Sequence, residues 1–540
     1  MSVTWPRIGR VLLVAVPLGF LALFYLYPVA SILLTGLLED GALDLSPFGD
    51  VLTSSSLRGV VWFTLWQAVA STVLTILAAM PIAYVFARFQ FPGKRLLSAL
   101  LTIPFVMPTV VVATAFLALL GSSSPLGIDL NRSIWIILAA HVFYNVAVVV
   151  RTVGGLWSHL DPRMEEAARS LGATRWQAFR NVTLPLLRPA LAAAAAIVFL
   201  FTFTSFGVIL ILGGLTYATL EVEIYRQTVV FVDLPVAAAL AILQLVGVSV
   251  ILWLYSRYQR HREVELSLLP AESVARRPST PRQRWAVIFT AAYVGVIAIL
   301  PLGLLVVRSF DAEGVFTFYR TLTDTGSTAF VSPLEAIGNS LWIAGVATVI
   351  ALVVGMSAAA VVAYRSGRAA RSFDLLLMLP LGTSAVTIGF GMLIALDWPV
   401  DLRTNVLLIP LAHALVAIPF VVRLSVPVMR SVRPQLREAA AMLGASPTRI
   451  WREIDLPIAA RALTVSAGFA FAISLGEFGA TSFIARPDTP TLPIAIFRLL
   501  GRPGTLNFGQ AMAMSTILMA VTATVILLVD RFRLRDVGEF

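Results

Sequence analysis

Few side chains in this 540-residue sequence could take part in chemistry. It contains no cysteine, which excludes a disulfide, a thiolate metal site and a cysteine nucleophile, and it has only four histidines. His141 and His413 have no companions at the spacing of metal ligands, so we expect them to form hydrogen bonds between helices and predict no metal site. With no cluster of catalytic side chains, the sequence predicts a protein that is not an enzyme.

The sequence also lacks a nucleotide-binding loop. A Walker A loop requires Gly-Lys followed by Ser or Thr, where the lysine and the backbone hold the phosphates. The only lysine is Lys94, in "FPGKRLL", and an arginine follows it. We therefore expect this chain to bind no cofactor, and any ATP and Mg²⁺ to be bound by another polypeptide.

One strongly polar stretch occurs twice. "PRMEEAARSLGATRWQAFRNVTLP" (162–185) returns as "PQLREAAAMLGASPTRIWREIDLP" (434–457). In each copy a proline suits a first helical turn, a glycine ends the helix, and a Ser or Thr cap starts a second short helix that the last proline closes. A single copy would suit an interfacial helix pair in which the Glu complements a helix N-terminus. Two copies in register favour a surface that docks on a partner.

The rest of the chain is apolar. It has 58% hydrophobic residues, 13% charged residues and a mean hydropathy of +0.88. Runs of about 20 apolar residues, enough to cross a bilayer, recur throughout. The fold class we predict is an all-α membrane protein with about twelve transmembrane helices. The expected spans are 11–34, 59–87, 97–121, 134–159, 190–213, 236–256, 286–308, 339–364, 373–397, 405–429, 462–484 and 510–530.

The distribution of Lys and Arg predicts the orientation. Most of them fall in cytoplasmic loops if the N-terminus lies in the cytoplasm, as the positive-inside rule requires. The net charge of +11 is spread over short loops, with no basic domain on which nucleic acid could dock. We expect a multi-pass protein of the bacterial cell (inner) membrane, with both termini and both polar stretches in the cytoplasm. The first apolar run is too long for a signal peptide and is interpreted as a retained span.

The two polar stretches belong to an internal repeat. His413 follows His141 by 272 residues, and the same offset relates Glu438 to Glu166 and Phe478 to Phe206. We predict a first repeat of six spans at 1–256, a polar, arginine-rich cytoplasmic linker at 257–285, and a second repeat of six spans at 286–540. Six spans in each repeat place both in the same orientation, related by an axis along the membrane normal.

The repeated stretches resemble the signature loop of permease subunits of bacterial ABC importers, E-A-A, three residues, Gly and a distal L-P. The resemblance covers the whole chain as two fused permease halves. It implies that these loops are coupling helices that dock two copies of a cytoplasmic ABC ATPase, and that an extracytoplasmic substrate-binding protein delivers the substrate. The predicted ATPase-coupling residues are Glu166, Ala167, Ala168, Gly172, Pro185, Glu438, Ala439, Ala440, Gly444 and Pro457.

Two further segments resemble the fused permeases for thiamine or thiamine pyrophosphate. They are "FTSFGVILILGGLTYATLEVEIYRQ" (203–227) and "LGEFGATSFIARPDTPTLPIAIFRLL" (475–500), and they carry this resemblance together with "LAAHVFYNVAVVVR" (138–151). Ferric-iron permeases share the fused layout and an acid-Phe-Gly element, and they remain the alternative. A secondary transporter with a 6+6 repeat is a more distant alternative, because it would keep coupling carboxylates in several spans and would leave the paired loops unexplained.

Glu477 lies in an apolar run, where an acid costs about 2.5–3.5 kcal/mol. A cationic substrate would give this acid a role, whereas a hydrogen bond between helices, or a place near the outer boundary, would explain it without one. Its repeat counterpart is Ser205. Phe206 and Phe478 could form a gate or a stacking surface, although aromatic residues in spans usually serve packing. The predicted substrate-path residues are thus Ser205, Phe206, Glu477 and Phe478.

Overall fold

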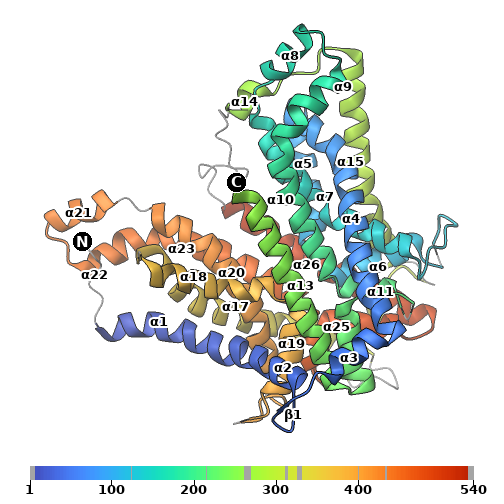
Figure 1. Ribbon diagram of the computed structural model, residues 1–540, viewed down its shortest axis with the longest axis vertical. Helices are drawn as coiled ribbons and strands as arrows, with labels where there is room; N and C mark the ends of the chain where they lie inside the picture. Colours follow the sequence, from blue (N-terminus) through green and yellow to red (C-terminus); the bar gives the residue numbers. More distant parts are fainter. Residues whose placement is uncertain are drawn as a thin grey trace. The chain divides into compact units, whose positions relative to one another are not determined.

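The structure is a computed structural model that describes residues 7–122, 124–214, 216–260, 269–310, 314–324, 331–365, 367–398, 400–431 and 434–532 (Figure 1). These residues are almost entirely helical, apart from a small antiparallel ribbon of β1 (Leu38–Glu39) and β2 (Ala42–Leu43). The predicted all-α membrane fold is confirmed. Residues 261–268 of the predicted linker lie outside the described residues.

The chain divides into two compact units. Unit 1 comprises Met1–Gly49, Ile224–Ile242 and Ser309–Phe540, and unit 2 comprises Asp50–Glu223 and Leu243–Arg308. Helices α3 (Ser46–Thr53), α12 (Leu220–Tyr225) and α13 (Leu234–Arg260) have residues in both.

The described helices of unit 1 begin with the N-terminal segment. They are α1 (Arg7–Leu21), η1 (Ala22–Leu26), α2 (Tyr27–Leu37), η3 (Arg226–Phe231), α16 (Thr317–Arg320), η4 (Thr321–Thr323), α17 (Pro333–Tyr364), α18 (Arg368–Gly382), α19 (Ala385–Ala395), α20 (Leu408–Ser431), α21 (Pro434–Met442), α22 (Pro447–Ile450), η5 (Trp451–Asp455), α23 (Leu456–Gly476), α24 (Thr481–Ile484), α25 (Leu492–Leu500) and α26 (Thr505–Phe532). Helices α17, α20 and α23 pack on one another, α1 lies along α17, and α2 packs on α19.

Unit 2 has a similar helical core. Its described helices are α4 (Ser55–Arg88), α5 (Lys94–Val106), α6 (Thr109–Leu120), α7 (Ile134–His159), α8 (Arg163–Ser170), α9 (Arg175–Ala178), η2 (Phe179–Thr183), α10 (Leu184–Phe203), α11 (Gly207–Leu212), α14 (Ala271–Val274) and α15 (Pro281–Arg308). Helices α4, α7 and α10 pack on one another, and α15 packs on α5 and α6.

The compact units differ from the sequence repeats in one respect. The first helix of the chain, α1, packs with helices of the second predicted repeat, and α15, which opens that repeat, packs with helices of the first. The repeat boundaries remain a prediction about sequence similarity, and the exchange of the two opening helices is a feature of the packing that the sequence did not reveal.

The described residues contain nine helices long and apolar enough to cross a membrane, two bent helix pairs that could each form a span, and the shorter apolar segment Ala462–Gly476. The spans predicted at 97–121 and 373–397 are therefore broken, because α5 and α6 meet at 104° and α18 and α19 at 97°. At the first break, Met107 is extended before Pro108, as steric contact with the proline ring requires. At the second, Ser384 caps the new helix by accepting a hydrogen bond from the backbone N–H of Thr387.

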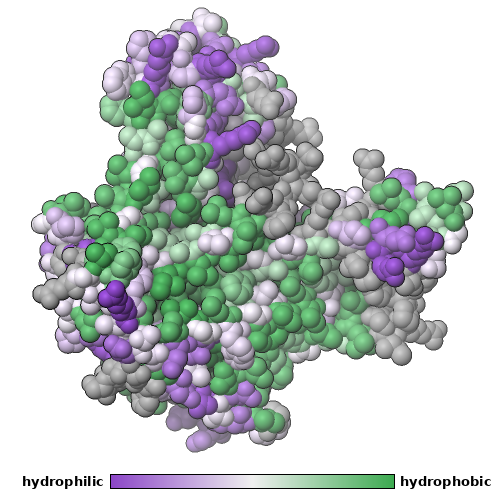
Figure 2. Space-filling view, turned by 180° about the vertical axis from the view of Figure 1, so that it is seen from behind, coloured by the Kyte–Doolittle hydropathy of each residue, from purple (hydrophilic) through white to green (hydrophobic). Residues whose placement is uncertain are grey.

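Large apolar side chains cover the outside of the long helices. Trp62, Leu77, Val349 and Leu375 are each more than 60% exposed, as suits contact with lipid. Hydrophilic side chains gather at the end of unit 2 that carries α8 and α9, whereas hydrophobic side chains cover the flanks of the spans (Figure 2). This distribution agrees with a multi-pass membrane protein.

Small residues allow close helix contacts in the core of unit 1. A Cβ atom placed on Gly389 of α19 would lie 2.6 Å from the backbone Cα and O atoms of Ala480, next to α24. By contrast, a Cβ atom on Gly345, in the long helix α17, would meet nothing within 4 Å.

We expect Gly389→Ala to destabilise the protein by about 1–3 kcal/mol, since a backbone segment must move to admit the methyl group. The measurement is the thermal unfolding of the detergent-solubilised chain. Gly345→Ala is the matched control and should unfold at the wild-type temperature or above it, because alanine favours a helix. Equal unfolding temperatures for Gly389→Ala and the wild type would contradict the packing described here.

Candidate coupling surfaces and a buried polar network

The first polar stretch forms the short helix α8 and the beginning of a longer helix, so only the first of the two predicted short helices is confirmed. The Asp161 carboxylate accepts a hydrogen bond from the Arg163 backbone N–H at 2.9 Å, and α8 ends at a turn in which Gly172 has a φ of +94°. Thr174 and Gln177 then form a capping box that begins α9. The prediction that Pro185 closes the second helix is wrong, because α9, η2 and α10 run from Arg175 to Phe203 as one helix, with Pro185 in the first turn of α10.

The second polar stretch repeats this geometry. Gly444, with a φ of +81°, follows α21, and the Ser446 hydroxyl accepts a hydrogen bond from the Arg449 backbone N–H at 3.4 Å. Pro457 stands in the first turn of α23. Since glycine adopts positive φ without a steric penalty, both turns are explained by the residue at this position.

The predicted coupling residues lie on the outside of these helices. Glu166, Ala167, Glu438 and Ala439 are exposed, and Ala168 and Ala440 are half-buried. The structure adds two exposed residues that our sequence reasoning missed. Leu171 is 90% exposed and Leu443 is 88% exposed, each directly before the turn glycine. The repeat offset places these two leucines in register, which is the signal that could have identified them.

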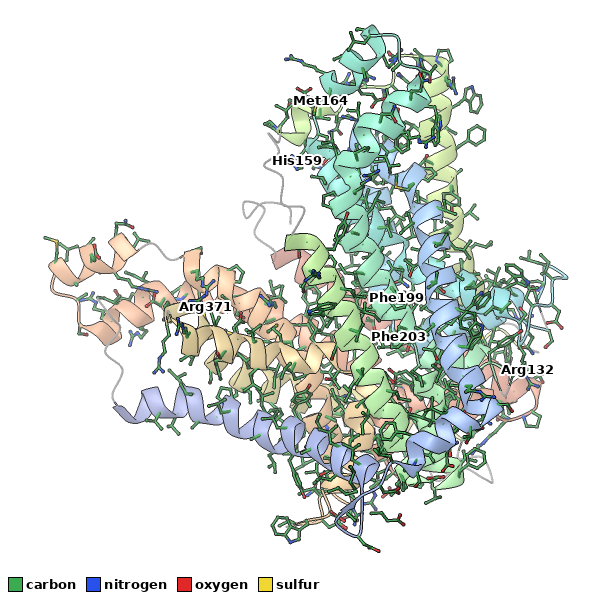
Figure 3. The ribbon with its side chains drawn as sticks, viewed as in Figure 1. Arg132, His159, Met164, Phe199, Phe203 and Arg371 are labelled. Carbon is green, nitrogen blue, oxygen red and sulfur yellow. The ribbon has the colours of Figure 1, made fainter. Side chains whose placement is uncertain are left out.

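The described part of the linker lies against unit 2. The contact is made by His159, which is labelled in Figure 3. The backbone N–H of Leu269 donates to the carbonyl oxygen of His159 at 3.0 Å, and Nδ1 of His159 lies 2.7 Å from the Leu269 carbonyl oxygen. Further along, Arg276 pairs with the backbone beside Phe89, and its Nη1 lies 3.8 Å from Oε1 of Glu166. Both side chains of this ion pair are exposed, so the pair contributes little stability. Nevertheless, it places the linker beside a predicted coupling residue.

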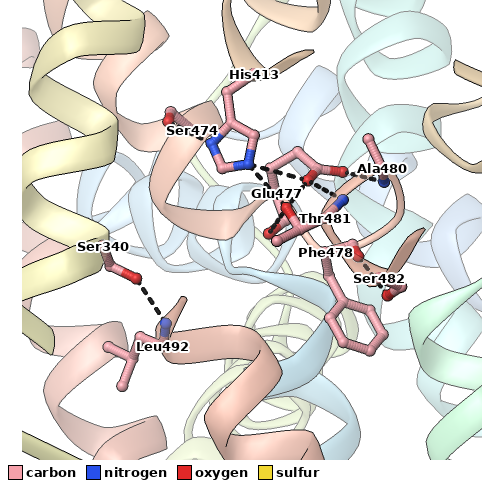
Figure 4. A network of polar contacts seen from close by, with 9 residues as sticks. All are labelled: Ser340, His413, Ser474, Glu477, Phe478, Ala480, Thr481, Ser482 and Leu492. Carbon is pink, nitrogen blue, oxygen red and sulfur yellow. Dashed lines mark hydrogen bonds and ion pairs between the residues drawn. The ribbon is translucent and has the colours of Figure 1, made fainter. Parts of the chain in front are cut away.

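Glu477 is the centre of a buried polar network in unit 1 (Figure 4). Its carboxylate accepts hydrogen bonds from the backbone N–H groups of Ala480 at 2.8 Å and Thr481 at 3.0 Å, and from the Thr481 hydroxyl. Nε2 of His413 lies 3.2 Å from the same carboxylate, and its Nδ1 lies 2.7 Å from the Ser474 hydroxyl. The carboxylate thus holds the backbone where the chain leaves α23 and enters α24.

Unit 2 contains the counterpart of this network. Nδ1 of His141 lies 2.9 Å from the Ser71 hydroxyl, and its Nε2 lies 2.9 Å from the hydroxyl of Ser205. Ser205 stands where α10 ends and α11 begins, as Glu477 stands between α23 and α24. The prediction that both histidines form hydrogen bonds between helices is confirmed.

The two predicted gate residues are buried. Phe478 packs edge-to-face on Phe497 with ring centroids 5.5 Å apart, and Phe206 is 6% exposed. In the structure these rings serve packing, and their role as a gate remains a prediction.

Another buried acid was missed by the sequence analysis. Glu221 is fully buried in unit 2 and accepts a hydrogen bond from the side-chain amide of Gln244. The segment "LEVEIY", with acids among apolar residues, was the available signal. Among the described residues, no group of three or more His, Cys, Asp or Glu side chains could hold a metal ion.

A family profile matches the chain twice. The profile is described as "Binding-protein-dependent transport system inner membrane component", and it matches residues 71–263 and 351–535. The chain belongs to this family. It is the membrane permease subunit of an ABC importer, and not an enzyme. The family assignment overturns the alternative of a secondary transporter.

Individual relatives differ in what they transport. The chain is 29% identical over 493 residues to the thiamine transport system permease protein ThiP of Brucella abortus, covering 87% of each chain. It is 31% identical over 243 residues to the sulfate transport system permease protein CysT of Escherichia coli, covering 43% of this chain and 86% of that protein. A bacterial ABC transporter that imports alginate aligns with a TM-score of 0.40 and 17% identity, covering 46% of this chain and 93% of that chain.

We expect Glu477→Gln to lower the stability of the protein by about 1–3 kcal/mol, because an amide offers a donor to a site where two backbone N–H groups already donate. Thermal unfolding of the solubilised chain measures the effect. Ser205→Ala, at the equivalent position in the other repeat, removes only one hydroxyl and should cost about 0.6 kcal/mol. A Glu477→Gln variant as stable as Ser205→Ala would show that the carboxylate does not hold this break in the helix.

Proposed function

We propose that this permease carries thiamine, or thiamine pyrophosphate, into the cell. The observation that carries the proposal is the similarity to the Brucella abortus thiamine permease, which extends over 87% of both chains and therefore over both repeats. The similarity to the sulfate permease covers only 43% of this chain. A relative with the same fused layout should match over more of the chain than that. The thiamine-like segments at 203–227 and 475–500 support the same substrate.

The substrate would pass the two breaks in the spans. Ser205 and Phe206 lie at the break between α10 and α11, and Glu477 and Phe478 at the break between α23 and α24. Thiamine carries a positively charged thiazolium ring, and Glu477 is an acid within the membrane region, where acids are retained for a pairing or a pathway. In the structure its carboxylate is fully engaged with Ala480, Thr481 and His413, so a cation would have to compete with these partners.

Two copies of a cytoplasmic ABC ATPase would drive the transport. They would dock on α8 and α21, which present Glu166 and Glu438 together with the exposed leucines Leu171 and Leu443. Apolar side chains exposed at the end of a polar helix suit a protein partner that covers them. An extracytoplasmic binding protein would deliver the substrate from the opposite face, with both termini of this chain in the cytoplasm. The ATPase would bind ATP and Mg²⁺, and this chain would bind no cofactor.

The test is uptake by vesicles that contain the permease, its cognate ATPase inside and its binding protein outside. Radiolabelled thiamine and thiamine pyrophosphate should enter in an ATP-dependent manner, whereas sulfate and ferric iron should not. Vesicles without ATP provide the background. ATP-dependent uptake of ferric iron or sulfate in place of thiamine would overturn the proposed substrate and leave the family assignment intact.

A further inference from the structure

A second contact, separate from the exposed glutamates, ties each coupling helix to the span that follows it. In unit 2 the Thr183 hydroxyl donates to Oε2 of Glu165 at 3.2 Å. In unit 1 Nη2 of Arg437 lies 2.7 Å from Oδ1 of Asp455, and Nε donates to the same oxygen at 2.8 Å. Residues 165 and 437 are related by the repeat offset, as are residues 183 and 455. The same two positions are therefore bonded in both repeats, although the residue types differ.

The two positions are equivalent in the structure as well as in the sequence. Residues 183 and 455 are the last residues of the π-helical segments η2 and η5, from which α10 and α23 continue. Residues 165 and 437 each directly precede the exposed coupling glutamate. Because neighbouring residues on an α-helix point about 100° apart, the glutamate can face a partner while the residue before it faces the span.

Burial supports this division of roles. The side chains of Arg437 and Asp455 are 20% and 7% exposed, and Thr183 is buried, whereas Glu438 is exposed. Partial burial opposes the charge of Arg437, but the hydrogen bond and charge of Asp455 outweigh it and raise the pKa of the guanidinium. An ion pair of this kind is held in one geometry, unlike the exposed pair between Arg276 and Glu166.

In unit 1 the contact also reaches the end of another long helix, α17. The Arg437 guanidinium lies over the ring of Tyr364, the last residue of α17, at 4.9 Å from its centroid, and Nη2 donates to the Tyr364 hydroxyl at 3.1 Å. The coupling helix α21 is thus anchored to two spans at once.

Without these contacts the coupling helix would be joined to its span through a flexible turn. Gly172 and Gly444 stand at the turns with positive φ, and a Cβ atom at either would meet nothing within 4 Å, so little packing resists movement there. A force applied to α8 or α21 would bend the turn before it moved the span.

We propose that the pairs Glu165–Thr183 and Arg437–Asp455 are positioning contacts that make each coupling helix move together with its span. The role in transport rests on the proposed docking of an ATPase on these helices. The two repeats have different residue types at these positions. The contact therefore requires a bond between the two positions and not a particular charge.

The test replaces the second pair by the first. Arg437→Glu places a carboxylate against Asp455, and Arg437→Glu with Asp455→Thr recreates the Glu–Thr pair of the first repeat. Because the chain has no cysteine, Leu443→Cys and Ala460→Cys can carry spin labels on the coupling turn and on α23. Pulsed electron spin resonance on the chain in nanodiscs should give a narrow distance distribution for the wild type, a broad one for Arg437→Glu, and a narrow one again for the double exchange.

A milder variant protects the test against a folding defect. Thr183→Val keeps the shape of the side chain and removes its hydroxyl, so it should broaden the distance distribution between labels at Leu171→Cys and Arg188→Cys. An Arg437→Glu distribution as narrow as that of the wild type, or a double exchange no narrower than the single variant, would overturn the proposal. If Arg437→Glu fails to insert, an unchanged distribution for Thr183→Val overturns it.

A second measurement separates loss of the contact between residues 437 and 455 from loss of ATPase docking. In vesicles with the cognate ATPase and binding protein, thiamine taken up per ATP hydrolysed should fall by about five-fold or more in Arg437→Glu, while the amount of co-purified ATPase stays the same. The double exchange should restore the ratio. The spin-label measurement uses neither thiamine nor an ATPase, so a wrong substrate would leave wild-type vesicles inactive without changing its result.

Discussion

A backbone broken inside a bilayer must find its hydrogen-bond partners within the protein, because lipid offers none. Both repeats of this permease break a span, after α10 and after α23. In the second repeat the Glu477 carboxylate supplies acceptors to the freed N–H groups of Ala480 and Thr481, and His413 fixes the carboxylate. In the first repeat the smaller Ser205 bonds to His141. Both breaks therefore carry a polar side chain bonded to the equivalent histidine, and only the second repeat places an acid there.

The two polar stretches, 162–185 and 434–457, differ from the buried breaks because they keep side chains exposed to solvent. In the function proposed here they would leave polar and apolar groups exposed for an ATPase and would also transmit force to the spans. Exposed leucines beside the turn glycines meet the first need. The bonds from residues 165 and 437 to the bases of α10 and α23 would meet the second. The repeats again bond equivalent positions through different residues.

Local features of the fold could be predicted from the sequence, because they depend on neighbouring residues. The helix caps at Thr174 and Ser446 and the turns at Gly172 and Gly444 follow from backbone preferences alone, and the repeat offset identified His141 and His413 as a pair. The bends of 104° and 97° were missed, since hydropathy measures the length of an apolar run and not its direction. The packing of α1 and α15 was missed because lipid-facing and protein-facing surfaces are both apolar. The bond between Arg437 and Asp455 was hidden because the first repeat has Glu and Thr at those positions.

In our proposal the two coupling helices, α8 and α21, each dock one ATPase subunit. The most direct measurement is native mass spectrometry of the complex purified from membranes that also contain the cognate ATPase. A complex of one permease chain with two ATPase subunits is expected. Glu166→Ala or Glu438→Ala alone should increase the fraction of complexes that carry only one ATPase subunit. A wild-type complex with a single ATPase subunit, or a permease that hydrolyses ATP by itself, would contradict this account.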